Sequence, residues 1–263
     1  MLNASSFFAP AALGIAVAGV MALPTAAIAA NITRVPGNFA YLTPSSPDGW
    51  ENLNWATRGR ASAPGDWEFG VTTDDNINGA VQQADWNWVN GQAVPWDLLW
   101  NAAENKLTFT IGGHVLVLDQ DGTPPGIFNG FYLWTTSRTD SRVDAGTQMY
   151  LQVNTVNGHT VEGSLVNSTA TAPVGGGQEI SKFFFASDVA ITTITGFARM
   201  SWPEGARNPQ QSGARDRVAF KIEGFYTGIT EEPPSVPEPA SLLGLFAVGS
   251  LGVMGRKALK TNA

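Results

Sequence analysis

Apolar and polar residues alternate with a period of two through much of the chain between residues 31 and 229, and this alternation limits its possible folds more than any other feature. Successive side chains of a strand point to opposite faces, so the pattern predicts strands that bury one face. Two hairpins are predicted where such runs flank a short turn: residues 107–118 around Gly112–Gly113, and residues 150–166 around Asn157–Gly158.

Two later segments extend this prediction. Residues 191–202 are rich in threonine and β-branched side chains, and residues 217–225 place Val218, Phe220 and Ile222 on one face of a strand. No apolar segment of the body keeps a period of 3.6 residues over three turns, as an amphipathic helix would. The sequence therefore predicts an all-β fold, a single antiparallel β-sandwich or jelly-roll domain over residues 31–229.

Composition narrows the possible functions. The chain has no cysteine, which excludes a disulfide framework, a cysteine-rich zinc site and a cysteine nucleophile. Its formal net charge of -7 argues against a nucleic-acid partner, because binding to phosphates needs clustered positive charge. The two histidines, His114 and His159, each follow a turn glycine at the start of a predicted strand, where a half-exposed spacer residue is expected.

The N-terminal segment has the pattern of a signal peptide. An apolar run over residues 11–23 precedes Pro24 and a run of small residues, as in an export signal with its cleavage site. The alternative, a buried N-terminal helix, fits Pro24 and the alanines less well. We expect residues 1–30 to be the signal peptide, with one cleavage site formed by Ala27, Ala29 and Ala30, so that the mature chain starts near Ala30 or Asn31.

The C-terminal segment has three parts in a fixed order. Residues 230–236 form an acidic, proline-rich spacer, residues 242–255 form an apolar run, and basic residues follow. A Pro-Glu-Pro tripeptide lies between the spacer and the apolar run. This order resembles the PEP-CTERM sorting signal of Gram-negative and cyanobacterial surface proteins. The residues that carry the resemblance are Val236, Pro237, Glu238, Pro239, Ala240, Arg256 and Lys257.

The resemblance implies that residues 237–263 are a sorting tail, which the membrane enzyme exosortase processes before the protein reaches the outer surface or the exopolysaccharide matrix. A helix over residues 242–255 would span roughly 20 Å, short of the ~30 Å hydrocarbon core, so we expect only a transient inner-membrane anchor. The basic residues after it would stay cytoplasmic, which places the body outside that membrane. An uncut, permanent anchor is the alternative.

Three tryptophans are candidates for carbohydrate binding, since an indole can stack on the apolar face of a sugar ring. Trp86 and Trp88 are predicted to share one face of a strand that a turn at Asn90–Gly91 brings opposite Ala93 and Pro95. The same placement also suits the core of a sandwich, so both interpretations stay open for this pair. Trp50 lies in a predicted loop and is expected to be more exposed.

A possible Ca²⁺ site begins at Asp74. The spacing of Asp74, Asn76 and Asn78, followed by Gly79, fits the start of a calcium-binding loop, and Asp85 stands at its twelfth position. Asp85 is shorter than the bidentate Glu usual there, and neither flank predicts a helix. The alternative is a turn rich in Asn and Asp with solvated charges.

The body has no G-x-S-x-G nucleophile elbow, no H-E-x-x-H helix and no phosphate-binding loop, so we expect no enzymatic activity. The sequence favours an exported structural or adhesive protein of the cell envelope or extracellular matrix, with exosortase and exopolysaccharide or surface components as partners. A non-catalytic carbohydrate-binding module for exopolysaccharide is the first alternative. An extracellular glycoside hydrolase is the second, because such an enzyme needs only two suitably placed carboxylates.

Overall fold

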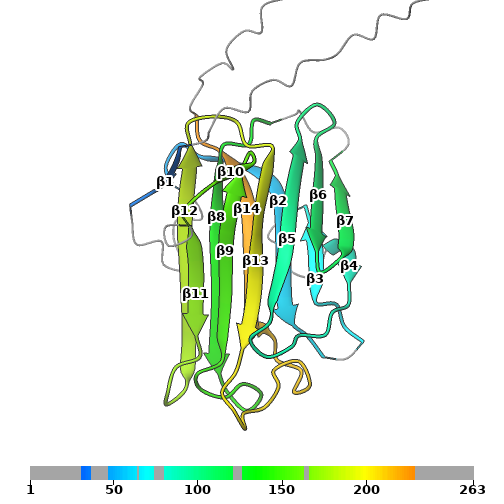
Figure 1. The fold of residues 1–263 in the computed structure, drawn as a ribbon, viewed down its shortest axis with the longest axis vertical. Helices are drawn as coiled ribbons and strands as arrows, with labels where there is room; N and C mark the ends of the chain where they lie inside the picture. The colour runs from blue at the N-terminus through cyan, green and yellow to red at the C-terminus, as the bar shows by residue number, and fades with distance from the viewer. Residues whose placement is uncertain are drawn as a thin grey trace, which may run out of the picture.

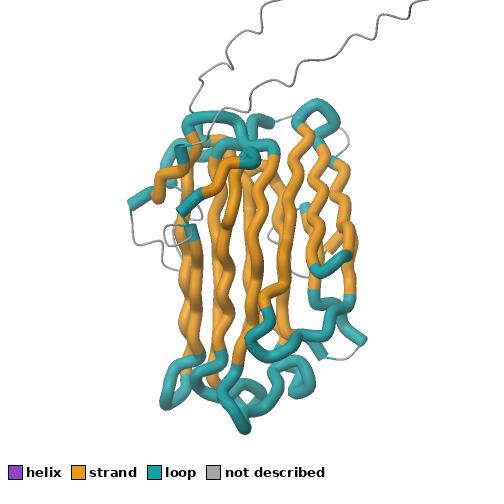
Figure 2. The backbone as a smooth tube through the Cα atoms, in the orientation of Figure 1, coloured by secondary structure: helices purple, strands orange, loops and turns teal. Residues whose placement is uncertain are grey.

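The structure, a computed structural model, describes residues 31–36, 47–63, 65–73, 80–120, 126–162 and 166–228. Over these residues the chain forms fourteen strands and no helix, so none of them forms a helix that could cross a membrane. The strands make two antiparallel sheets that face each other (Figures 1 and 2). The predicted all-β sandwich is confirmed.

The first sheet takes strands from both ends of the body. Its order is β1 (Ile32–Arg34), β12 (Gly177–Ser187), β8 (Gly130–Thr139), β14 (Arg215–Tyr226), β2 (Glu51–Ala61), β3 (Phe69–Thr72) and β4 (Ala80–Ala84). The long central strands β8, β14 and β2 run the length of the sandwich. At ~3.3 Å per residue, the 12 residues of β14 span roughly 40 Å.

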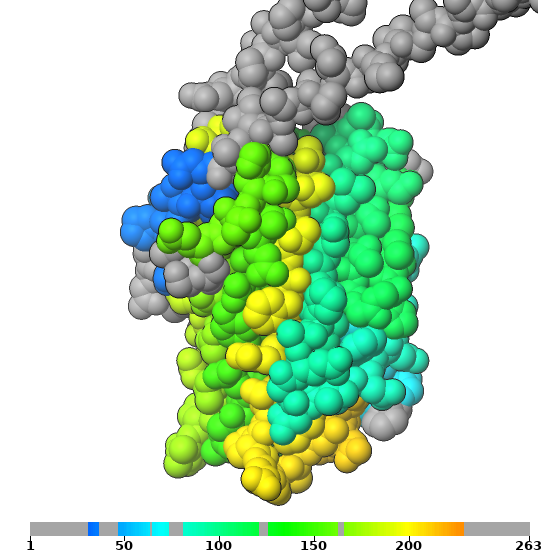
Figure 3. Space-filling model, viewed as in Figure 1, coloured from blue at the N-terminus to red at the C-terminus, as the bar shows by residue number. Residues whose placement is uncertain are grey.

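The second sheet is built mainly from the middle of the chain. Its order is β10 (His159–Thr160), β9 (Gln148–Val156), β13 (Thr193–Ser201), β5 (Ala93–Asn101), β6 (Lys106–Ile111) and β7 (His114–Asp119), and β11 (Asn167–Thr171) also pairs with β9. The space-filling view looks onto this sheet, with β9, β13 and β5 running side by side down the face (Figure 3).

The first predicted hairpin is confirmed. Strands β6 and β7 pair from Ile111 opposite His114 outward, and the glycines between them have φ of 57° and 86°. Side chains other than Gly and Asn rarely adopt this left-handed conformation, which explains why two glycines stand at the turn. Of the other predicted strands, residues 191–202 contain β13, and residues 217–225 lie within β14.

The second predicted hairpin is shorter than expected. Asn157 and Gly158 form the turn, but the returning strand β10 has only two residues, and the next strand is the separate β11. A strand predicted over residues 159–166 is therefore wrong in extent. The reason is tertiary: β9 pairs with β10 near its end and with β11 along the rest of its length, so two short strands share one edge.

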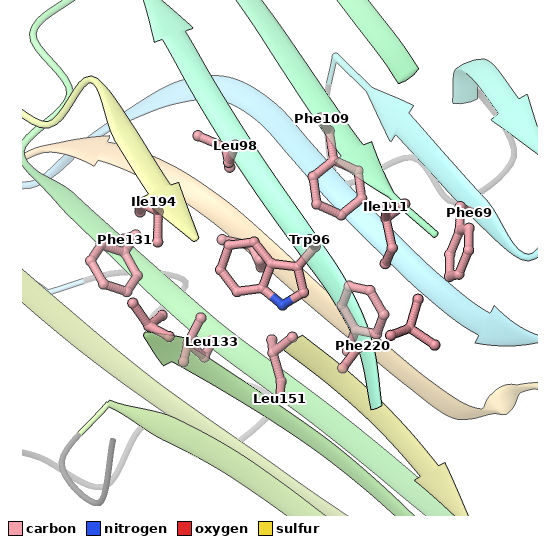
Figure 4. Close-up of a cluster of buried hydrophobic side chains, with 14 of the residues drawn as sticks. Phe69, Trp96, Leu98, Phe109, Ile111, Phe131, Leu133, Leu151, Ile194 and Phe220 are labelled. Carbon is pink, nitrogen blue, oxygen red and sulfur yellow. The ribbon is translucent and has the colours of Figure 1, made fainter. Parts of the chain in front are cut away.

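The core lies between the inner faces of the two sheets (Figure 4). The predicted inward face of β14, with Val218, Phe220 and Ile222, belongs to this core. The opposite face of β14 is also covered, since Lys221 is 9% and Glu223 is 4% exposed, and the two side chains form an ion pair. The first sheet is thus largely buried on both faces around β14.

Two buried tryptophans lie directly against glycines of neighbouring strands. A Cβ added to Gly224 would lie 2.0 Å from the ring of Trp55, and a Cβ added to Gly196 would lie 2.5 Å from the ring of Trp96. Only the absence of a side chain leaves room for these indoles. Several of the tryptophans that the sequence concentrates in the first half of the body are therefore core residues.

Hydrogen bonds of side chains join the two sheets on both sides of the sandwich. On one side, the hydroxyls of Thr135 in the interior strand β8 and Ser168 in β11 are hydrogen-bonded at 2.9 Å. On the other, the backbone N–H of Val117 in β7 donates to the side chain of Gln82 in β4 at 2.7 Å. These hydrogen bonds tie the two sheets together in addition to the shared core.

Candidate functional site

A cavity of about 590 Å³ opens where β4 ends and β5 begins. It combines one aromatic ring, two carboxylates, one imidazole and several amides. The residues that line it are Gly65, Glu68, Asp85, Trp86, Asn87, Val89, Gln92, His114 and Gln210. They come from the turn before β3, the segment that links the two sheets, the start of β7 and the loop before β14.

The segment that links the sheets, residues 85–89, is not a strand, so no neighbouring strand satisfies its backbone groups. Two side chains do so instead. Glu68 accepts from the backbone N–H of Trp86 at 2.9 Å, and Gln210 accepts from the backbone N–H of Trp88 at 3.0 Å. The Gln210 amide also donates to the carbonyl of Trp86 and to Glu68, the latter at 2.8 Å. Buried backbone groups need such partners, so these two side chains fix the segment.

The predicted hairpin that would bring Trp86 and Trp88 opposite Ala93 and Pro95 is wrong. A turn does form, since the N–H of Gln92 donates to the carbonyl of Val89 at 3.0 Å. However, that turn carries the chain from the first sheet to the second, and β5 pairs with β13 and β6 instead. The sequence of a short turn is the same whether the next strand pairs with the previous one or belongs to the other sheet. The turn signal alone therefore does not predict a hairpin.

The two neighbouring tryptophans have different environments. Trp88 is 3% exposed, packs edge-on against Phe69 and donates from Nε1 to the carbonyl of Arg60 at 2.9 Å. Its ring belongs to the core and offers no face to a ligand. Trp86 is half-buried and lines the cavity, with its ring against Gly112 and perpendicular to His114 at 6.2 Å between centroids.

Trp50, the third candidate, lies in another region. It is half-buried on the outer face of the first sheet, where it packs against Phe184 at 5.6 Å and Phe225 at 5.7 Å between ring centroids. It is not among the residues that line the cavity around Trp86. The three tryptophans therefore do not form one shared surface for stacking on a sugar.

Among the described carboxyls, Glu68 and Asp97 have raised pKa values, and burial is the main cause for both. Burial raises the pKa of Glu68 and the nearby charge of Asp85 raises it further. The hydrogen bonds from Trp86 and Gln210 and the charge of Arg60 offset this only in part. At Asp140, burial is outweighed by hydrogen bonds from Arg142 and Arg217 and by the charge of Arg217, so the pKa is lowered. The cavity thus holds a buried carboxyl group whose charged form the protein stabilises only in part.

A similar lowering occurs at Asp144, whose hydrogen bonds with the side chain and backbone of Arg207 bring its pKa to about 2. Asp144 and Asp140 lie in the loop between β8 and β9. Their arginine partners come from the loop before β14 and from β14 itself. The Asp144–Arg207 pair joins two loops and the Asp140–Arg217 pair joins a loop to β14, whereas Glu68 lines a cavity.

Only part of the predicted calcium loop can be located. Asp74, Asn76 and Asn78 lie outside the described residues, whereas Asp85 is exposed and lines the cavity. Within the described part of the chain, no three His, Asp or Glu side chains come together as metal ligands. The calcium site stays a prediction.

Of the two histidines, His114 lines the cavity and His159 lies at the start of β10, and both are half-buried. The sequence analysis missed Glu68 and Gln210. Glu68 had a detectable signal, because it is an acid between two aromatic residues, Trp67 and Phe69, in a segment that the structure buries. Gln210 had none, since it lies in a polar loop far along the chain.

The cavity lies at the opposite end of the sandwich from the ends of the described body. At that other end, Asn129 accepts from the N–H of Thr227 at 2.8 Å and from the N–H of Ser187 at 2.8 Å. Ser187 pairs with Ile32, so the first and last strands meet there. In Figure 1 this end is uppermost, and β4 runs towards the lower end while β5 starts from it.

Comparison with known proteins identifies the C-terminal segment. A model of the PEP-CTERM protein-sorting motif matches residues 235–258, which include the predicted residues Val236, Pro237, Glu238, Pro239, Ala240, Arg256 and Lys257. No curated protein matches the chain. The matched segment, the apolar run 242–255 and the predicted signal peptide all lie outside the described residues, so their structure and exact boundaries stay predictions.

Proposed function

We propose that this chain, an exported protein that ends in a PEP-CTERM motif for sorting by exosortase, is a structural and adhesive component of the cell envelope or extracellular matrix. Its body acts without catalysis as a rigid module. The membrane passage is transient and serves sorting, after which the sandwich stays at the outer surface or in the matrix.

The observation that carries this proposal is that the sorting tail and the cavity lie towards different ends of the sandwich. The described chain ends at Gly228, at the end of the body where β1 and β14 meet Asn129, and the sorting tail follows in sequence. The cavity around Trp86 opens towards the opposite end, because Glu68 bonds to Arg60, which pairs with Ala219 in the first half of β14. A module held by its tail would present this cavity to its surroundings.

A fractionation experiment tests the proposal. Cells that express the wild-type chain should retain the body in the envelope or matrix fraction, and removal of the protein should weaken cell aggregation or matrix cohesion. A variant with Pro237, Glu238 and Pro239 replaced by Ala should keep signal-peptide cleavage but accumulate in the inner membrane. A wild-type body that is found free in the medium, with unchanged cohesion after its removal, would contradict the proposal.

Carbohydrate binding is the second candidate function, and the cavity favours it. The half-buried ring of Trp86 supplies an apolar surface, and Asn87, Gln92 and Gln210 supply amide donors and acceptors around it. Pockets that bind small ligands combine these two features. The volume of about 590 Å³ suits one or two sugar units.

The hydrolase alternative also has a candidate pair, because Glu68 and Asp85 line the same cavity. We favour binding over hydrolysis because both oxygens of Glu68 accept hydrogen bonds that hold the 85–89 segment. A general acid would have to release its proton without losing these contacts. Reducing ends released from an exopolysaccharide by the purified protein would establish hydrolysis instead.

A further inference from the structure

We propose that the cavity around Trp86 binds a sugar with a free ammonium group, such as the glucosamine unit of an exopolysaccharide that is not fully N-acetylated. This inference rests on the proposed carbohydrate binding and names its ligand class. It is argued from the charges, the ring and the amides that line the cavity.

The cavity has a negatively charged lining. Two carboxylates, Glu68 and Asp85, line the cavity, and no lysine or arginine is among the described lining residues. The charge of Arg60 stabilises ionised Glu68 in part, but the Arg60 guanidinium is itself paired with Asp66 at 2.8 Å and with Asp216 at 3.4 Å. An anionic ligand would meet repulsion here, whereas an ammonium would be attracted.

Glu68 is the better placed of the two carboxylates for strong recognition. Its side chain belongs to a residue that is 2% exposed, so a charge partner at this site would be screened little by water. Each oxygen accepts one hydrogen bond, from Trp86 or from Gln210, and a carboxylate oxygen has a second lone pair. One N–H of an ammonium can use that remaining capacity. Asp85 is exposed and would interact from the mouth of the cavity.

Trp86 supplies the complementary surface. Its ring is fixed against Gly112, where an added Cβ would lie 2.8 Å from the indole, and against Phe69 at 5.8 Å between centroids. A fixed indole can stack on the apolar face of a pyranose and also attracts a nearby cation. The amides of Asn87 and Gln92 can bond to the hydroxyls of the same sugar.

Titration calorimetry with three glycans tests this inference. The purified protein, with its tail kept in mild detergent, is titrated with oligomers of glucosamine, of N-acetylglucosamine and of glucose. We expect the glucosamine oligomer to bind at least tenfold more tightly than the other two. Its affinity should fall as salt is raised, because the attraction is between charges.

Two variants locate the site. Asp85→Asn should weaken binding of the glucosamine oligomer at least fivefold, and Asp85 is exposed, so the fold should be retained. Asp119→Asn is the matched control, since Asp119 is an exposed carboxylate on β7 that does not line the cavity, and it should bind as the wild type does.

The outcomes separate the two proposals. Equal binding of all three glycans would overturn the ammonium ligand and leave carbohydrate binding intact. Binding to none of them would overturn both. Equal weakening by Asp85→Asn and Asp119→Asn would show attraction to the overall negative charge and would also overturn the ammonium site.

Discussion

Trp86 and Trp88 are separated by one residue, yet one lines a cavity and the other fills the core. Trp88 is enclosed, with Phe69 beside its ring and Arg60 bonded to its indole N–H. Trp86 shares the contact with Phe69 but keeps part of its ring in the cavity. Both backbones are held by Gln210. The comparison teaches that one side chain, Gln210, can fix the backbone of a core residue and of a candidate binding residue at the same time.

The largest effect is expected from Trp88→Ala. Loss of a buried indole removes apolar burial and leaves a cavity, which should lower the free energy of unfolding by about 3 to 5 kcal/mol. Denaturant unfolding followed by fluorescence or circular dichroism measures this. A loss below about 1 kcal/mol would show that the site is not part of the core.

Gln210→Ala should have the next largest effect. It removes partners from the Trp88 N–H, the Trp86 carbonyl and Glu68, and each buried group left unpaired costs about 1 to 3 kcal/mol. Because water can enter the cavity and replace part of these bonds, we expect a total of about 2 to 3 kcal/mol in denaturant unfolding. Gln211→Ala, at the exposed neighbouring position, is the control and should change little. Equal losses of stability in the two variants would show that the hydrogen bonds of Gln210 to Trp86 and Trp88 do not stabilise the fold.

Trp86→Ala should destabilise the protein less than either change, by about 1 kcal/mol, because the ring is only half-buried. It should instead abolish binding of a glucosamine oligomer. The same unfolding measurement, combined with calorimetry, gives both values for one sample. A loss of stability as large as that of Trp88→Ala would remove the difference between the two tryptophans.

The smallest effect is a change in the pH dependence of stability at Glu68. Its raised pKa means that the native state binds more protons than the unfolded state between pH 4.5 and the raised value, so this group makes stability fall as pH rises through that window. Glu68→Gln should remove that component of the slope, seen in unfolding curves from pH 4 to 8.

Asp140 gives the contrast in sign. Its lowered pKa stabilises the fold above about pH 3.8, and this contribution is lost as pH falls through the lower, native-state value. Asp140→Asn should therefore destabilise the protein at neutral pH and converge with the wild type in strong acid. If Glu68→Gln showed that same behaviour, the assignment of a raised pKa to the buried Glu68 carboxyl would be wrong.

Local sequence patterns were sufficient to predict those features whose residues are neighbours in the chain. The hairpin of β6 and β7 follows from alternation and from a Gly-Gly turn, and the inward face of β14 follows from the period of two. The sorting motif is likewise a continuous segment, so its residues could be identified without any fold. In each case the determining residues are close together in the chain.

Tertiary structure alone decided the candidate site. The sequence determined that the body is a β-sandwich and that the chain is exported, because strand periodicity and sorting signals each depend on residues that are close together in the chain. The cavity depends on Glu68 and Gln210, which lie 142 positions apart and meet only after the sheets have paired. Which tryptophan is buried depends on where the chain crosses between the sheets. No local propensity encodes that crossing, because it results from long-range pairing and from packing of the shared core.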